Sequence, residues 1–167
     1  LAVQTAKEIF RFLDEDDFTD GPVEIISGSS ADSVKALTWY WASEWYYDAQ
    51  RYDDALSYAR KALDASHKRG LEEVACDCSN VLSIAYFRKS DYRRSLEYAR
   101  QTLEAARRLE DESRIAYSLN TLAGICLASK QSSEGIKYIT EAILICEKQK
   151  DSLKLAVRCG MAAELYH

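Results

Sequence analysis

Apolar residues recur every three or four positions along most of this chain, with polar residues between them. Leu56, Ala59, Leu63 and Ser66 form one such stripe, which has the spacing of a helix that buries one face. Short polar stretches, such as residues 48–51, separate consecutive stripes. The pattern predicts helices over residues 31–49, 52–68, 71–89, 92–108, 111–129, 132–149 and 152–166.

The helical pattern repeats with a period of about 40 residues, and a period of this size indicates a stack of similar helix pairs. Residues 31–70, 71–110 and 111–150 align without a gap, and residues 151–167 begin a partial fourth row. Tyr46 and Leu56 recur as Tyr86 and Leu96. Small residues also recur, with Ser43, Ser83, Ala123 and Ala163 in one column and Ala55, Ser95 and Gly135 in another. We expect helices to cross closely there, since a Leu would overpack such a column by roughly 1–3 kcal/mol.

These residues resemble the tetratricopeptide repeat family in its long-period variety. The first helices supply Trp39, Ala42, Ser43 and Tyr46, then Leu82, Ser83 and Tyr86, then Leu119, Leu122, Ala123 and Cys126. The second helices supply Ala55, Leu56, Ala59, Ala62 and Leu63, with similar residues in the next two rows. The proline that the family carries after the second helix is missing from every row. The resemblance implies an all-α, right-handed α-solenoid of antiparallel helix pairs, with about three and a half repeats and an N-terminal capping helix.

The two ends of the chain depart from the repeat. We assign residues 1–30 to a capping helix and an acidic linker, and residues 31–167 to the repeat array. Residues 2–13, with Val23, Ile25 and Ile26, are expected to fold back over the aromatic helix at 31–49, because a helix that is apolar all round needs covering. The acidic run from Asp14 to Asp20 is interpreted as a linker, since an EF-type calcium loop would place Phe18 at a ligand position.

The far end has no such cover, because no partner helix follows residues 152–166. We expect either further repeats beyond His167 or self-association through this helix. A chain that begins at Leu1 and not at Met is expected to be a processed or excised piece. Helix ends are marked by Gly70, a candidate C-cap, and by Asp111 and Asp151, candidate N-caps.

The family resemblance also implies where a ligand binds, because the first helices of such repeats line an inner wall. The candidate peptide-binding residues on this wall are Tyr40, Trp41, Glu44, Tyr47, Asp77, Asn80, Phe87, Arg88, Tyr117 and Asn120. Asn80 and Asn120 occupy one column, where similar proteins use asparagine to hold a peptide backbone. An amide can both donate and accept, so it matches a peptide bond. The alternative, that each asparagine is tied to neighbouring backbone or to a nearby side chain, stays open.

The wall is expected to be somewhat acidic, because it carries Glu44, Asp48, Asp77 and Glu164 against Arg88 as its one cation. Complementary charge favours a basic or neutral peptide. No Lys or Arg flanks the two asparagines, so capture of a free C-terminal carboxylate is not expected. Two asparagine contacts would supply about 2–6 kcal/mol against an association cost of at least ~4 kcal/mol, so the aromatic candidates must contribute to affinity.

Composition excludes several other classes of function. A net charge of −5 argues against nucleic acid, and the pairs Lys68-Arg69, Arg93-Arg94 and Arg107-Arg108 are expected to be solvated helix ends. No run of apolar residues approaches the ~20 residues that a helix needs to span a bilayer. Five cysteines cannot all pair with one another, and Cys76 and Cys78 lie on nearly opposite helix faces, so no metal site is expected. We interpret Cys126, Cys146 and Cys159 as small buried residues, and reduced thiols slightly favour a cytoplasmic compartment. The alternative of a processed N-terminus and export stays open.

The sequence therefore predicts a non-catalytic scaffold that binds a protein or peptide and needs no cofactor. His67 and His167 lack a nucleophile or acid partner in the sequence, and no phosphate-binding loop appears. Two alternatives to this prediction remain. In the first, the chain is the sensory or regulatory module of a larger bacterial signalling protein, such as a transcription regulator or sensor kinase. In the second, it is a self-association scaffold that forms a homodimer through residues 152–166.

Overall fold

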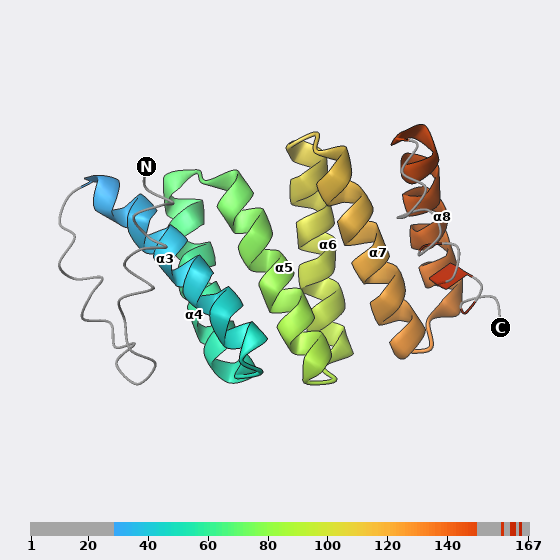
Figure 1. Ribbon diagram of the computed structural model, residues 1–167, viewed down its shortest axis with the longest axis horizontal. Helices are drawn as coiled ribbons and strands as arrows, with labels where there is room; N and C mark the ends of the chain where they lie inside the picture. Colours follow the sequence, from blue (N-terminus) through green and yellow to red (C-terminus); the bar gives the residue numbers. More distant parts are fainter. Residues whose placement is uncertain (1–28, 150–157, 159–160, 163, 165–167) are drawn as a thin grey trace. The chain divides into compact units, whose positions relative to one another are not determined.

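The computed structural model describes residues 29–149, together with residues 158, 161, 162 and 164. Between residues 29 and 149 the chain is all-α (Figure 1). The helices are α3 (Ser29–Asp48), α4 (Tyr52–Arg69), α5 (Glu72–Arg88), α6 (Tyr92–Arg108), α7 (Glu112–Ala128) and α8 (Ser132–Gln149). They confirm the predicted helical-repeat fold, and the starts at Tyr52, Tyr92 and Ser132 keep the period of the sequence repeat.

The turns between these helices share one backbone conformation. The left-handed residues are Gln50, Gly70, Ser90, Glu110 and Lys130, which are evenly spaced along the chain, with φ between 54° and 65°. In each turn the following residue donates its N–H to a carbonyl five positions earlier, as Asp91 does to Tyr86 at 3.0 Å. This is the Schellman arrangement, which satisfies carbonyls that a helix end leaves unpaired. Gly70 is confirmed as a C-cap.

Two aspartates cap the helices that follow these turns. Asp111 accepts a hydrogen bond from the backbone N–H of Arg114 at 3.0 Å, which confirms the predicted N-cap. Asp91 does the same for Arg94 at 3.1 Å, at the start of α6. Arg51 holds the matching position before α4 and provides no side-chain cap; it pairs instead with Asp54 at 2.8 Å. A carboxylate at an N-terminus also interacts favourably with the helix dipole.

The described chain forms two compact units, one ending at Ala85 and one beginning at Tyr86. In the first unit α3 packs against α4. Its core contains Ala42, Tyr46 and Ala55, with Tyr58 packed against them. The rings of Tyr46 and Tyr58 stack with their centroids 5.3 Å apart. None of the Trp or Tyr side chains of α3 between residues 39 and 47 is exposed.

In the second unit α7 packs against both α6 and α8. Its main core cluster contains Leu96, Ala99, Leu103, Leu119, Leu122, Ile125, Cys126 and Ala142. Two ion pairs tie α6 to α8 with the same sequence offset: Arg100 to Glu134 and Arg107 to Glu141, each at 2.7 Å. The alternation of first and second helices therefore places the exposed faces of α6 and α8 within reach of each other.

The predicted small-residue columns are buried wherever the structure describes them. Ser43, Ser83 and Ala123 are fully buried, as are Ala55 and Ser95, and Gly135 is buried as well. Cys126 and Cys146 are buried free thiols, as predicted. Residues 2–13, Val23, Ile25, Ile26, Asp151, Cys159 and Ala163 lie outside the described residues, as does most of the predicted helix 152–166.

Candidate functional site

Three of the predicted wall residues come together in the first unit. The hydroxyl of Tyr40 hydrogen-bonds the carboxylate of Glu44 one turn along α3, and Asp77 of α5 lies close enough to act electrostatically on both. Burial raises the pKa of Glu44, and Asp77 and Asp48 raise it further, although the hydrogen bond from Tyr40 opposes them. Burial and the two carboxylates also raise the pKa of Tyr40. The cluster is therefore a half-buried concentration of negative charge.

The other candidates in the first unit take different environments. Trp41 is half-buried, with its ring centroid 5.2 Å from that of Tyr40. Tyr47 packs against the core around Tyr46, and its ring lies 5.7 Å from that of Tyr52. Asn80 is half-buried on α5. Trp41 thus adjoins the Tyr40–Glu44–Asp77 cluster, whereas Tyr47 contributes to packing.

The candidate residues of the second unit likewise differ, because one packs in the core and the others are exposed. Phe87 packs against the core cluster, with its ring 5.8 Å from that of Tyr92. Arg88 is exposed at the end of α5. Tyr117 of α7 is 51% exposed, which is unusual for so large an aromatic side chain. Of these three, Tyr117 presents the most surface to a partner.

Asn120 lies one turn after Tyr117 on α7. Its Oδ1 atom is buried and has no hydrogen-bond donor among the described residues. A buried acceptor without a donor costs about 1–3 kcal/mol, so each such atom in a folded protein calls for a physical reason.

Elements of nucleophilic or metal chemistry are weak in the described part of the chain. Burial raises the pKa of the Cys126 thiol to about 11, and burial with Asp77 and Glu44 raises the pKa of Cys78 as well. Both groups are therefore neutral thiols near pH 7, which are poor nucleophiles. Within the described ranges, no group of three or more His, Cys, Asp or Glu side chains is arranged to hold a metal ion. None of the described helices is both long and apolar enough to cross a membrane.

One further cluster of side chains was not predicted from the sequence. Lys68 and Arg69, expected to be a solvated helix end, are exposed, yet they line a pocket with Lys35, Trp39 and Lys61. The residues that line the pocket come from both α3 and α4, so only the packing of these helices brings them together. A sequence signal did exist: Lys61 and Lys68 are spaced by two turns on one helix face.

Comparison by sequence places residues 76–112 in a family model described as Tetratricopeptide repeat. The matched segment begins inside α5, includes α6 and ends at the first residue of α7. No curated protein matches the chain. The family match and the period of the sequence agree on the same type of repeat.

Several solved structures share the fold. Aspartyl phosphate phosphatase F from Bacillus subtilis matches with a TM-score of 0.78 at 14% identity, over 88% of this chain and 38% of that one. BtubC from P. vanneervenii matches with a TM-score of 0.72 at 17% identity, over 87% and 63%. A Rap protein complexed with Competence and Sporulation Factor matches with a TM-score of 0.64 at 16% identity, over 99% and 50%. The chain thus spans less than two thirds of the length of each.

Proposed function

From the premise that this chain carries tetratricopeptide repeats and is a protein-interaction scaffold, we propose that it binds a basic or neutral peptide segment of a partner on its first-helix faces. The observation that carries this proposal is the unbalanced charge of Glu44. Its carboxylate is half-buried, and Asp77 and Asp48 disfavour its ionised form. A Lys or Arg side chain of a partner would relieve that repulsion, and the nearby rings of Tyr40 and Trp41 would pack along its aliphatic stem.

In the second unit, Tyr117 and Asn120 would make the contacts of the same kind of ligand. Tyr117 offers an exposed ring, and rings of this type are common at interaction hot spots. The Oδ1 of Asn120 would accept a backbone N–H of the peptide. A hydrogen bond that satisfies this oxygen supports specificity for an extended main chain more than for any one side chain. Asn80, at the same position of the preceding repeat, is proposed to act in the same way.

The test is a panel of labelled peptides of equal length, with basic, neutral or acidic side chains, titrated against the protein by fluorescence anisotropy. Basic peptides should bind most tightly. A Glu44→Gln/Asp77→Asn variant should bind them about tenfold more weakly or worse, since close charge pairs contribute about 1.5 kcal/mol or more. An Asn80→Ala/Asn120→Ala variant should weaken basic and neutral peptides alike. Glu97→Gln/Glu147→Gln, which neutralises two exposed carboxylates elsewhere, is the matched control. Equal binding of basic and acidic peptides would contradict the proposal.

A second candidate function is a sensory or regulatory module within a longer signalling protein. It is favoured by the partial coverage of the similar structures, which include an aspartyl phosphate phosphatase and a Rap protein complexed with a factor. On this proposal the peptide site described above would serve as the input of the module. Self-association through residues 152–166 stays a prediction; light scattering at several concentrations tests it, and a strict monomer would rule it out.

A further inference from the structure

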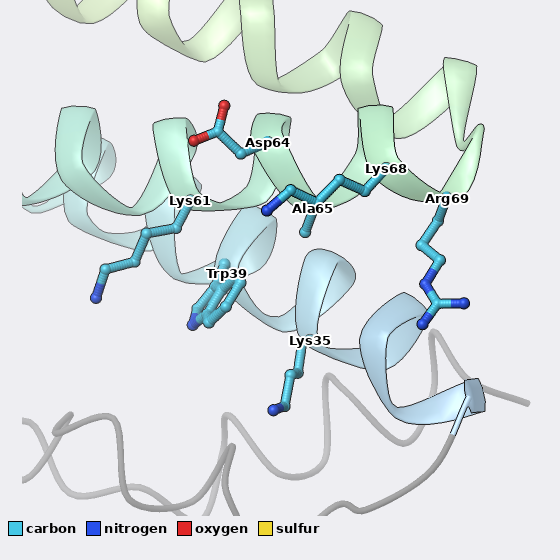
Figure 2. Close-up of a pocket in the computed structure, with 7 residues that line it drawn as sticks. All are labelled: Lys35, Trp39, Lys61, Asp64, Ala65, Lys68 and Arg69. Carbon is cyan, nitrogen blue, oxygen red and sulfur yellow. The ribbon is translucent and has the colours of Figure 1, made fainter.

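A pocket of about 430 Å³ lies between α3 and α4, within the first unit (Figure 2). It is lined by Lys35 and Trp39 of α3 and by five residues of α4 between Lys61 and Arg69. The residues proposed above to bind a peptide are different ones. Small-molecule pockets have volumes of about 300–1,000 Å³. This pocket is therefore large enough for a compact organic ligand.

Trp39 gives the pocket an apolar surface and a hydrogen-bond donor that lacks a partner. Its ring is half-buried, and Ala65 of α4 lines the same pocket with a methyl group. The indole Nε1 of Trp39 is buried and has no acceptor among the described residues. An indole ring stacks with other planar rings, and its N–H donates a hydrogen bond but accepts none. A planar ligand that carries an oxygen acceptor would therefore suit this side chain.

Two cations flank the apolar surface, one from each helix. Lys35 lies one turn before Trp39 on α3, and Lys68 lies about one turn after Ala65 on α4. Neither lysine forms an ion pair with a residue that the structure describes. Both side chains are long and flexible and carry their charge at the tip. Lys35 and Lys68 are therefore available to an anionic group of a ligand.

The other charged residues of the pocket leave this balance unchanged. Lys61 and Arg69 each already have an interaction of their own, and Lys61 lies 5.2 Å from the ring of Tyr58. Asp64 is exposed, and Figure 2 shows its carboxylate pointing away from Trp39. The charge that is available beside the tryptophan ring is therefore positive.

We propose that this pocket binds a small aromatic carboxylate, whose ring stacks on Trp39 and whose anionic group is held by Lys35 and Lys68. The carboxylate would also accept a hydrogen bond from Nε1 of Trp39. Two available cations, with Asp64 at the rim, suit one negative charge better than the two of a phosphate group. Lys68 is exposed and Lys35 half-buried, so each ion pair contributes little, and affinity depends on ring and charge acting together.

Nuclear magnetic resonance tests the site through the indole N–H signals of the isotope-labelled chain, titrated with cinnamate. The chain has three tryptophans, and the signal of Trp39 is the one that is lost in Trp39→Phe. This signal should shift and saturate with a Kd on the order of millimolar, as expected of a ligand with about a dozen non-hydrogen atoms. Cinnamamide, which lacks the charge, and cyclohexanepropionate, which lacks the planar ring, should each bind about threefold more weakly or worse.

The contrary outcomes of this titration are equally specific. The absence of a saturable shift at about tenfold the expected Kd would overturn the proposal, as would a shift confined to the other two tryptophans. Equal affinity for cinnamate and cinnamamide would show that the pocket selects apolar rings and not anions. Equal affinity for cinnamate and cyclohexanepropionate would show that Trp39 does not stack with the ligand.

Paired substitutions test the two lysines. Lys35→Gln/Lys68→Gln should weaken cinnamate binding about three- to tenfold, as expected for losing two exposed ion pairs. The same variant should bind cinnamamide as the wild-type chain does, which distinguishes a lost charge from a damaged fold. Arg93→Gln/Lys137→Gln removes two exposed cations outside the pocket and should leave cinnamate binding unchanged. Equal losses in the two double variants would assign the binding to the overall charge of the chain and overturn the proposal.

Discussion

Tyr86 and Tyr98 stack face to face, with ring centroids 5.7 Å apart and planes inclined by only 8°. Tyr46 and Tyr58 make the same pair in the preceding repeat, and a guanidinium covers the first ring in both cases, Arg51 at 4.7 Å and Arg94 at 5.3 Å. The stack joins the first helix of a repeat to the second. In the third repeat Cys126 occupies the position of the first tyrosine, so this repeat has no such tyrosine stack.

We predict that the Tyr86–Tyr98 stack contributes about 0.5–1.5 kcal/mol beyond the burial of the two rings. The measurement is a double-mutant cycle of Tyr86→Leu and Tyr98→Leu by urea unfolding. Each single variant should destabilise the chain, and the double variant should cost less than the sum. Tyr117→Leu, at a ring 51% exposed, should change the free energy of unfolding by less than about 0.5 kcal/mol. Strict additivity would mean that the rings only fill space.

The turns give a second prediction. Glu110 is exposed and adopts φ 54°, a conformation that costs a residue with a Cβ about 1–2 kcal/mol. Glu110→Gly should therefore stabilise the chain by about 0.5–1 kcal/mol, since part of the relief is offset by the greater freedom of glycine in the unfolded chain. Gly70→Ala should destabilise by a similar amount, because a Cβ there meets no atom within 4 Å and only the backbone is strained.

Chemical denaturation of both variants checks this prediction, with Gln101→Gly as control. Gln101 is exposed within α6, where glycine lowers stability by about 1 kcal/mol. If Glu110→Gly destabilised the chain as much as Gln101→Gly does, the left-handed turn would not be the source of strain.

The helix N-caps give a third prediction. Asp91→Ala should destabilise the chain by about 1 kcal/mol, because the backbone N–H of Arg94 loses its acceptor. Asp91→Asn should cost less, since the amide oxygen still accepts that hydrogen bond, and the variant loses the 3.5 Å ion pair to Arg94 and the attraction between the carboxylate and the helix dipole. Equal losses in the two variants, measured by thermal unfolding, would assign the effect to charge and not to capping.

The sequence predicted the helices well because the repeat supplies three copies of each boundary. The range 92–108 agrees with α6 at both ends, and 31–49 differs from α3 by two residues or fewer. The non-glycine turns at Gln50 and Ser90 were not predicted, because no side chain there marks a left-handed backbone. The pocket around Trp39 was missed for a different reason: it depends on which faces of α3 and α4 meet. The family resemblance did place Tyr40 and Glu44 on one wall, but it did not predict how much their surroundings perturb the carboxylate.

Glu44 yields a prediction about pH. Its pKa is raised in the folded state, so the folded chain holds this proton more tightly than the unfolded chain does. Stability linked to Glu44 is therefore lost as pH rises from the unfolded pKa through the folded one, and ionised Glu44 is destabilising at pH 7. Glu44→Gln should raise the free energy of unfolding at pH 7, and the gain should shrink to nothing below the usual glutamate range. The same substitution should weaken the binding of basic peptides. This trade-off is expected where a group that serves binding lowers the stability of the fold. A lower free energy of unfolding for Glu44→Gln than for the wild-type chain at pH 7 would contradict the prediction.

Glu134 should show the opposite dependence on pH. The hydroxyl of Tyr138 donates to its carboxylate at 2.9 Å and Arg100 donates at 2.7 Å, and these two hydrogen bonds hold the pKa of Glu134 below its usual value. A lowered pKa contributes stability that is present above the unfolded pKa and is lost as pH falls through the folded one. Glu134→Gln should therefore make unfolding less sensitive to pH below about 4.3, the usual glutamate value. Tyr138→Phe removes one of the two donors and should have part of the same effect. Urea titrations between pH 2.5 and 6, arranged as a cycle with Arg100→Gln, measure this; if Glu134→Gln left the pH dependence unchanged, the link between α6 and α8 would lie in the Arg107–Glu141 pair instead.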